Sequence, residues 1–136
     1  MARPARTRNV SAAQARSYLA KAEEYLAASE SELDAERGIA ATSLAIHAAI
    51  NAADAVCGVR LGKRASGPDH DRAGPLLKEA GRDGAELDKD LRRLLPMKTK
   101  AEYDPDDIPL PAASTAVGRA QRCVAVARRV VAAATR

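Results

Sequence analysis

Apolar residues recur at intervals of three and four along most of the chain, the spacing of helices that bury one side. In the first such segment Ser11 stands three residues before Gln14, which is the capping-box pattern of a helix N-terminus. An apolar series continues from Ala15 to Leu33, and charged residues occupy much of the space between its members. We therefore predict a first helix that starts at Ser11 and leaves one face in water.

The most apolar stretch follows, without a charged residue from Gly38 through Ala53. We predict a second, central helix from about Asp34 to about Arg60, and its lack of charge means that it must be covered on nearly every side. At about 100° per residue, large apolar residues fall on one face and alanines on the opposite face: Ile39, Ile46, Ile50 and Cys57 against Ala41, Ala45, Ala48, Ala52 and Ala55. The alanine face lets another helix approach closely, from the same bundle or from a second copy.

Glycine and proline divide the rest of the chain. After a loop we expect a short third helix, capped by Asp69 and ending near Ala80, and then a break at "GRDG". Leucines mark a fourth helix that runs on toward Tyr103 with a kink at Pro96, before the extended acidic connector "DPDDIPLP". A fifth helix from about Ala112 to about Ala134 buries Ala113, Val117, Ala120, Val124, Ala127 and Val131, and leaves Arg122, Arg129 and Arg136 as a basic line.

These elements predict an all-α, single-domain antiparallel bundle of four to five helices over residues 11–136, preceded by a disordered basic leader over residues 1–10. The composition agrees, because 46% of the residues are hydrophobic and only 2% are aromatic, so the core consists of small and branched aliphatic side chains. The 22 cations and 18 anions give a mixed surface that leans only weakly toward polyanions. Cys57 and Cys123 lie within apolar patterns, which predicts buried, reduced thiols and a cytoplasmic location, without a membrane span.

Four polar residues interrupt the central helix at intervals of four, four and three, so they fall on one side of it: Ser43, His47, Asn51 and Asp54. An imidazole with an amide and a carboxylate nearby suits a general acid or base, or the floor of a binding site. The same residues also suit a structural network that fixes the register of packed helices. Both interpretations stay open on the sequence alone.

Metal chemistry has weaker support. Asp69, His70 and Asp71 would need His47 from a separate helix to complete a site, so we expect capping and solvent exposure for them instead. The acidic residues between Glu102 and Asp107 lack the spacing and the glycine of a calcium loop. We predict no metal and no cofactor.

Three segments together resemble the HEPN superfamily (higher eukaryotes and prokaryotes nucleotide-binding). "ARSYLAKAEEYLAAS" is similar to the opening helix of these domains, "DHDRAGPLL" to the start of their third helix, and "LLPMKTKAEYD" to the segment that leads to an aromatic residue and an acidic turn. The resemblance implies an all-α bundle that is commonly dimeric. It further implies either a metal-independent ribonuclease or a partner of a nucleotidyltransferase in toxin–antitoxin and defence systems.

Nucleases of this superfamily carry an arginine and a histidine, four to six residues apart, on a late helix. The corresponding segment here, Lys98 to Tyr103, contains no histidine. Arg64 and His70 have five residues between them, but they lie in the loop before the third helix, so we interpret this spacing as coincidence. Lys98 or Lys100 would then supply only the charge that stabilises a phosphorane, and His47 or His70 would have to move the proton.

The leading hypothesis is a HEPN-like module without the usual nuclease motif, which binds a nucleotide, RNA or a protein partner, as a homodimer. The binding candidates are Ser43, His47, Asn51, Asp54, Lys98, Lys100 and Tyr103. One alternative is a metal-independent ribonuclease with a displaced active site at His47 or His70, and another is a structural assembly protein with the alanine face as its interface. A nucleotidyltransferase is a possible partner in the first two cases.

Overall fold

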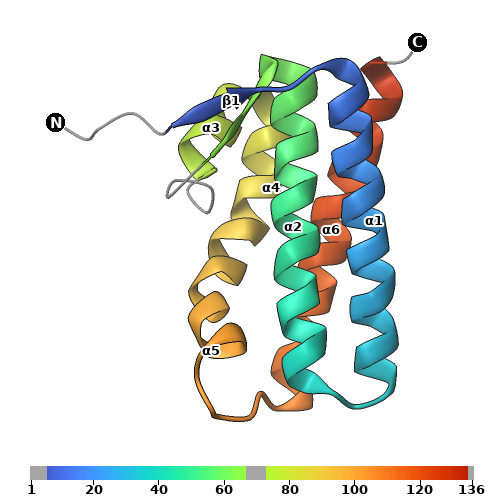
Figure 1. Cartoon of the computed structure of the whole chain (residues 1–136), viewed down its shortest axis with the longest axis vertical. Helices are drawn as coiled ribbons and strands as arrows, with labels where there is room; N and C mark the ends of the chain where they lie inside the picture. Colours follow the sequence, from blue (N-terminus) through green and yellow to red (C-terminus); the bar gives the residue numbers. More distant parts are fainter. Residues whose placement is uncertain (1–5, 67–72, 135–136) are drawn as a thin grey trace, which may run out of the picture.

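The computed structural model describes residues 6–66 and 73–134. The elements in chain order are β1 (Thr7–Asn9), α1 (Ala12–Asp34), α2 (Gly38–Leu61), β2 (Lys63–Ala65), α3 (Gly74–Glu79), α4 (Gly81–Leu94), a 3-10 turn (Leu95–Met97), α5 (Lys98–Glu102) and α6 (Leu110–Ala134). The four long helices α1, α2, α4 and α6 alternate in direction along the long axis of the molecule (Figure 1). The predicted all-α antiparallel bundle is therefore confirmed.

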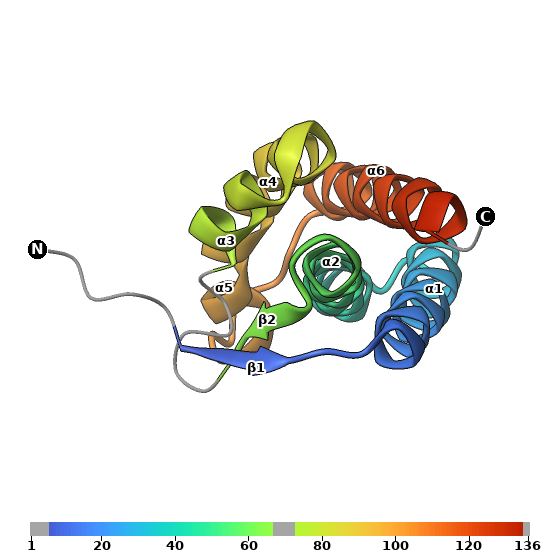
Figure 2. The ribbon, with the colours of Figure 1, turned by 90° about the horizontal axis from the view of Figure 1, so that it is seen from above.

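Helix α2 is the centre of the bundle, with α1, α6, α4 and α5 around it (Figure 2). Every residue of α2 from Ala48 to Gly58 is buried, including Asp54. The stretch without charge, which ends at Ala53, requires such cover. Helix α2 is also the one helix, among the residues described, that is long and apolar enough to cross a membrane, although 72% of that window is buried inside the bundle. A helix in the core of a bundle can be as long and as apolar as a membrane span, so length and composition alone are weak evidence for one.

The alanine face of α2 is covered within the same chain. Ala41, Ala45, Ala48, Ala52 and Ala55 all have 0% exposure. The hypothesis that this face joins two copies in a structural assembly is therefore wrong, because no surface of these alanines is left for a second chain. On the isoleucine face the first member, Ile39, is 38% exposed at the end of the bundle, so the expectation of core is wrong for that residue.

The helix N-terminus predicted at Ser11 is confirmed. The amide of Gln14 donates to Ser11 Oγ at 3.1 Å and the amide of Ser11 donates to Gln14 Oε1 at 2.9 Å, which completes the capping box. Helix α2 starts at Gly38 rather than near Asp34, because Glu36 adopts a left-handed φ of 61° and turns the chain between the helices.

A short strand pair corrects the expectation of a disordered leader. Residues 1–5 lie outside the described part, but Thr7–Asn9 pair antiparallel with Lys63–Ala65, and the amide of Val10 donates to Gly62 O at 2.8 Å. Val10 packs against Gly58, where an added Cβ would lie 2.6 Å from Val10 Cγ1. The N-terminal segment thereby holds β2, which follows directly on α2, in a fixed position at the end of the bundle.

The segment from α3 to α6 matches the expected order with two changes. The break predicted at "GRDG" is limited to its first residue: Gly81, with a φ of 88°, turns the backbone between α3 and α4, and the rest of the segment belongs to α4. Helix α3 begins at Gly74, after Ala73, and the predicted cap Asp69 lies outside the described residues. The six apolar positions predicted for the last helix are all buried in α6, and Cys57 and Cys123 are buried free thiols.

Candidate functional site

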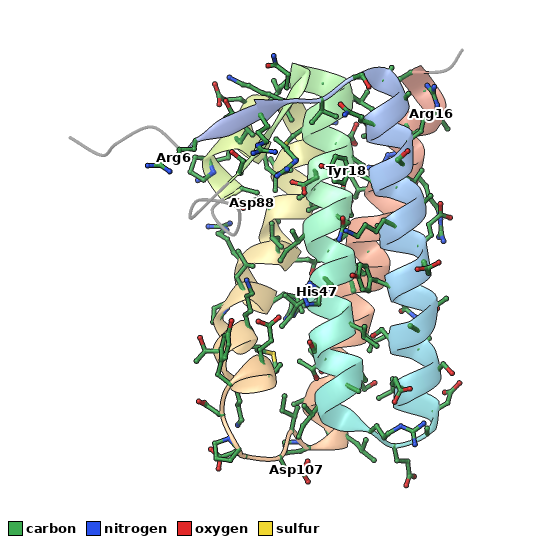
Figure 3. The ribbon with its side chains drawn as sticks, in the orientation of Figure 1. Arg6, Arg16, Tyr18, His47, Asp88 and Asp107 are labelled. Atoms are coloured by element: carbon green, nitrogen blue, oxygen red, sulfur yellow. The ribbon has the colours of Figure 1, made fainter. Side chains whose placement is uncertain are left out.

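A cleft of about 400 Å³ opens over α2 between α1 on one side and β2 and α5 on the other. We call it the central cleft, and its lining residues are Tyr18, Lys21, Tyr25, His47, Ile50, Asn51, Asp54, Arg64 and Lys98. Both Tyr18 and His47 line this cleft, and Figure 3 labels them, with Tyr18 nearer the β1 end of the bundle. Four separate elements thus contribute polar side chains to one hollow.

The floor of the central cleft comes from the polar side of α2. His47, Asn51 and Asp54 follow one another at intervals of about one turn and all line the cleft. The Asn51 side chain donates from Nδ2 to the carbonyl oxygen of His47 at 2.8 Å, and Asp54 is only 1% exposed. The alignment predicted from the sequence is present for these three residues, whereas Ser43 is half-buried and is not among the residues that line the cleft.

The imidazole of His47 is held from two sides. Its Nε2 lies 3.1 Å from Oε1 of Glu102 on α5, and its ring stacks on Tyr25 of α1 with centroids 5.4 Å apart at 29°. The carboxylate and the aromatic ring together restrict the orientation of the side chain. His47 is therefore a positioned imidazole in a partly exposed site.

Three cations surround this floor. Lys21 Nζ lies 5.9 Å from the centroid of Tyr25, and Arg64 Cζ lies 5.6 Å from the centroid of Tyr18. Both distances allow a cation–π attraction, on the order of 1 kcal/mol or less where water has access. Lys98 lines the cleft from α5. The cleft therefore combines positive charge from α1, β2 and α5 with two aromatic rings.

Asp54 is the electrostatically unusual member of the cleft. Burial raises the pKa of its carboxyl group to about 7, and the positive charges of Arg64 and Lys21 only partly oppose this effect. Burial, together with the charge of Asp54, likewise raises the pKa of the Cys57 thiol to about 12, which keeps that thiol protonated. A carboxyl group that changes charge near neutral pH inside a cationic cleft is typical of a functional site.

Several residues of the cleft were not predicted from the sequence. Tyr18, Lys21 and Tyr25 are spaced three and four apart on α1, a spacing that places them on one helix face. A single lysine at such a position is typical of a solvent-exposed surface, so the spacing alone did not indicate a site. Arg64 was assigned to a loop and reaches the cleft because β2 is paired with β1. Glu102 was considered only as one of the acidic residues that do not form a calcium loop, and in the structure it contacts His47.

Other predicted site residues lie elsewhere. Lys100 is exposed and Tyr103 is 76% exposed, and neither lines the central cleft. Asp69, His70 and Asp71 lie outside the described residues. Across residues 6–66 and 73–134, no three His, Cys, Asp or Glu side chains come together in the way that a metal site needs.

A second hollow of about 520 Å³ is lined by residues of α4 and α6. These two helices lie next to each other, on the side of α2 away from β1 (Figure 2). All lining residues of the hollow are charged, and Asp90 accepts hydrogen bonds from Arg119 and Arg122 at its centre. Arg129 of the predicted basic line pairs with Asp83 and Glu86 of α4, and Arg136 lies outside the described residues. These pairs join two helices at the surface, and no aromatic ring or buried side chain lines the hollow, so the central cleft is the better candidate site.

The fold and the cleft define a small helical-bundle protein with a polar site built on its central helix. The chain belongs to the HEPN domain family, because the model of that family matches residues 15–136. The match extends from the first turns of α1 to the end of the chain and includes every residue that lines the central cleft. Searches of curated proteins and of solved structures gave no significant match.

The raised pKa of Asp54 predicts a measurable effect on stability. An aspartate with a pKa near 4 when unfolded and about 7 when folded binds more protons in the folded state, so the free energy of unfolding falls as the pH rises between these values. Asp54→Asn removes this loss. We expect the variant to match the wild type near pH 4 and to exceed its unfolding free energy by on the order of 4 kcal/mol at pH 8, measured by urea denaturation.

The exposed Asp106→Asn serves as the control for loss of a carboxylate at the surface. It should shift stability by less than about 0.5 kcal/mol at either pH. Parallel pH curves for the wild type and Asp54→Asn would contradict the raised pKa.

Proposed function

We propose that this protein is a nucleotide-binding HEPN module, which holds a phosphorylated nucleoside, free or as a unit of single-stranded RNA, in the central cleft. The observation that carries the proposal is the convergence of Lys21, Arg64 and Lys98 with two tyrosine rings around the floor of one hollow. The family supports it in general terms, since HEPN domains are often linked to nucleotides or RNA. The volume of about 400 Å³ lies within the range of small-ligand sites.

The three cations of the cleft would bind the phosphate group of the nucleotide. Lysine and arginine bind phosphate oxygens through charge-assisted hydrogen bonds, and arginine adds a planar fork of donors. Three such groups from three elements surround one space, so a phosphate there would meet positive charge from several sides. A neutral ligand would lose the charge-assisted part of these contacts, and a cationic ligand would be repelled.

The two tyrosine rings of the cleft would stack on the base of the nucleotide. Stacking of a nucleic-acid base on an aromatic side chain is worth about 1–3 kcal/mol and depends little on the identity of the base. Tyr18 and Tyr25 both line the cleft from α1. Arg64 lies over the ring of Tyr18, and Lys21 and the stacked His47 ring lie over that of Tyr25, so a base that stacks on either tyrosine takes the place of one of these groups. Asn51 adds an amide on the floor for hydrogen bonds to a base edge.

Two further proposals come from the family rather than from the cleft. We propose that the protein forms a homodimer, and that a nucleotidyltransferase is a partner in the cell. The two buried free thiols support a reducing, cytoplasmic location. Sedimentation velocity of the purified chain tests the dimer directly, and a single monomeric species at micromolar concentration would contradict it.

The binding proposal predicts how charge variants behave toward adenosine 5′-monophosphate in isothermal titration calorimetry. Lys98→Ala should weaken binding about tenfold or more, because a charge-assisted contact to phosphate is worth about 1.5–3 kcal/mol. Lys100→Ala is the matched control: it removes the same charge two residues away, on a side chain that does not line the cleft, and should leave affinity within about twofold.

Adenosine without its phosphate should bind at least tenfold more weakly than the monophosphate, for the same reason. Equal losses in Lys98→Ala and Lys100→Ala would mean that only long-range charge matters. Such a result would contradict the central cleft as the binding site.

Metal-independent RNA cleavage is the second candidate function, and the contact between His47 and Glu102 favours it. An imidazole oriented by a carboxylate can take the proton of a ribose 2′-hydroxyl, and Lys98 in the same cleft can stabilise the phosphorane. In the sequence His47 and Lys98 belong to different predicted helices, whereas in the structure both line one cleft of a single chain.

Incubation of single-stranded RNA with the protein in EDTA distinguishes the two functions. Under the binding proposal the RNA stays intact. Cleavage that survives the chelator and is lost in His47→Ala would replace binding with catalysis as the function of the cleft. His47→Ala must also keep the circular dichroism spectrum and unfolding midpoint of the wild type, since the ring packs on Tyr25.

A further inference from the structure

Building on the proposed function, we propose that Asp54 takes up a proton when a phosphate group enters the central cleft, so that the protein binds its nucleotide and a proton together. The carboxyl group then acts as a hydrogen-bond donor to the bound phosphate. Asp54 is thereby a specificity-determining residue that ties nucleotide affinity to pH.

A phosphate bound in the central cleft would lie beside Asp54. Its side chain lies on the floor of the cleft at 1% exposure, and the cations that attract a phosphate line the same space. Water cannot enter between a buried carboxylate and an adjacent ligand as it does at a surface, so their repulsion is poorly screened. Two anions in such a space share a proton, as paired carboxylates do.

The charged and titratable groups around Asp54 come from every element that forms the cleft. Among the described residues they are Tyr18, Lys21 and Tyr25 from α1, His47 and Cys57 from α2, Arg64 from β2 and Lys98 from α5. The positive charges of Arg64 and Lys21 favour the ionised form of Asp54. A phosphate bound to these two cations neutralises their effect on Asp54 and adds its own negative charge next to the carboxyl group.

Both changes act in the same direction on a group that is already near its titration point. In the free protein, burial places the pKa of Asp54 at about 7, so the carboxyl group is mostly ionised at pH 8. Phosphate binding raises that pKa further, and the proton comes from solvent. No bond is made or broken other than the O–H bond of the carboxylic acid.

Linkage gives the sign of the effect. Between the pKa of Asp54 in the free protein and its higher value in the complex, each binding event consumes protons, so affinity falls as the pH rises. The phosphate of a nucleoside monophosphate is fully charged in this range because its second pKa is about 6. Its own titration therefore contributes little above pH 7.5.

The experiment is isothermal titration calorimetry with adenosine 5′-monophosphate at pH 8, repeated in buffers of different ionisation enthalpy. The dependence of the observed heat on the buffer measures the protons taken up per nucleotide. We expect an uptake of about 0.5 or more for the wild type and an affinity that falls up to about tenfold per pH unit above pH 7. Asp54→Asn, which keeps the shape and lacks the titration, should show no uptake and a constant affinity from pH 7 to pH 9.

His47→Gln tests the other acid–base group on the floor: an uptake that is lost in this variant and kept in Asp54→Asn would assign the proton to His47 and overturn the inference. Binding by the wild type without proton uptake, or with an uptake that persists in Asp54→Asn, would overturn the inference while leaving the nucleotide site in place. An absence of binding heat in the wild type, together with no retention of the nucleotide in equilibrium dialysis, would overturn the proposed function itself, and the inference with it.

Discussion

The close packing of α2 on all sides but one is the constraint on which the rest of this structure depends. The alanines of α2 let α1 and α6 approach without large side chains between the backbones, and from Ala41 to Ala55 all of them have 0% exposure. From Gly38 through Ala53 this helix has no charged group with which to meet water, so its neighbours must stay in place for it to be stable. The single polar side then faces the gap that α1, β2 and α5 leave open.

Polar side chains of α2 face this gap from a helix that is held in place by its neighbours. Side chains on a buried helix have few alternatives in orientation, and His47 is further held by Glu102 and Tyr25. The burial of Asp54 raises the pKa of its carboxyl group to about 7 and costs stability at neutral pH. Such a cost is expected where a residue is retained for binding or catalysis rather than for the fold.

The helices were predictable from the sequence because periodicity and capping are local signals, as at Ser11 and throughout α2. The alignment of His47, Asn51 and Asp54 was predictable for the same reason, since it depends only on helix geometry. What these residues face was not predictable. Arg64 and Glu102 reach them through a three-residue strand pair and a five-residue helix, elements too short for any periodic pattern. The burial of the alanine face likewise depends on which helix covers it, which is a property of the tertiary structure.

The account rests on the claim that the open side of α2 is where a nucleotide binds. Titration of isotope-labelled protein with adenosine 5′-monophosphate, followed through backbone amide chemical shifts, tests this claim most directly. We predict that the shifts cluster at residues of the central cleft, from Tyr18 to Tyr25 on α1, from His47 to Asp54 on α2, and at Arg64 and Lys98. Shifts confined to the charged hollow between α4 and α6 would contradict the account.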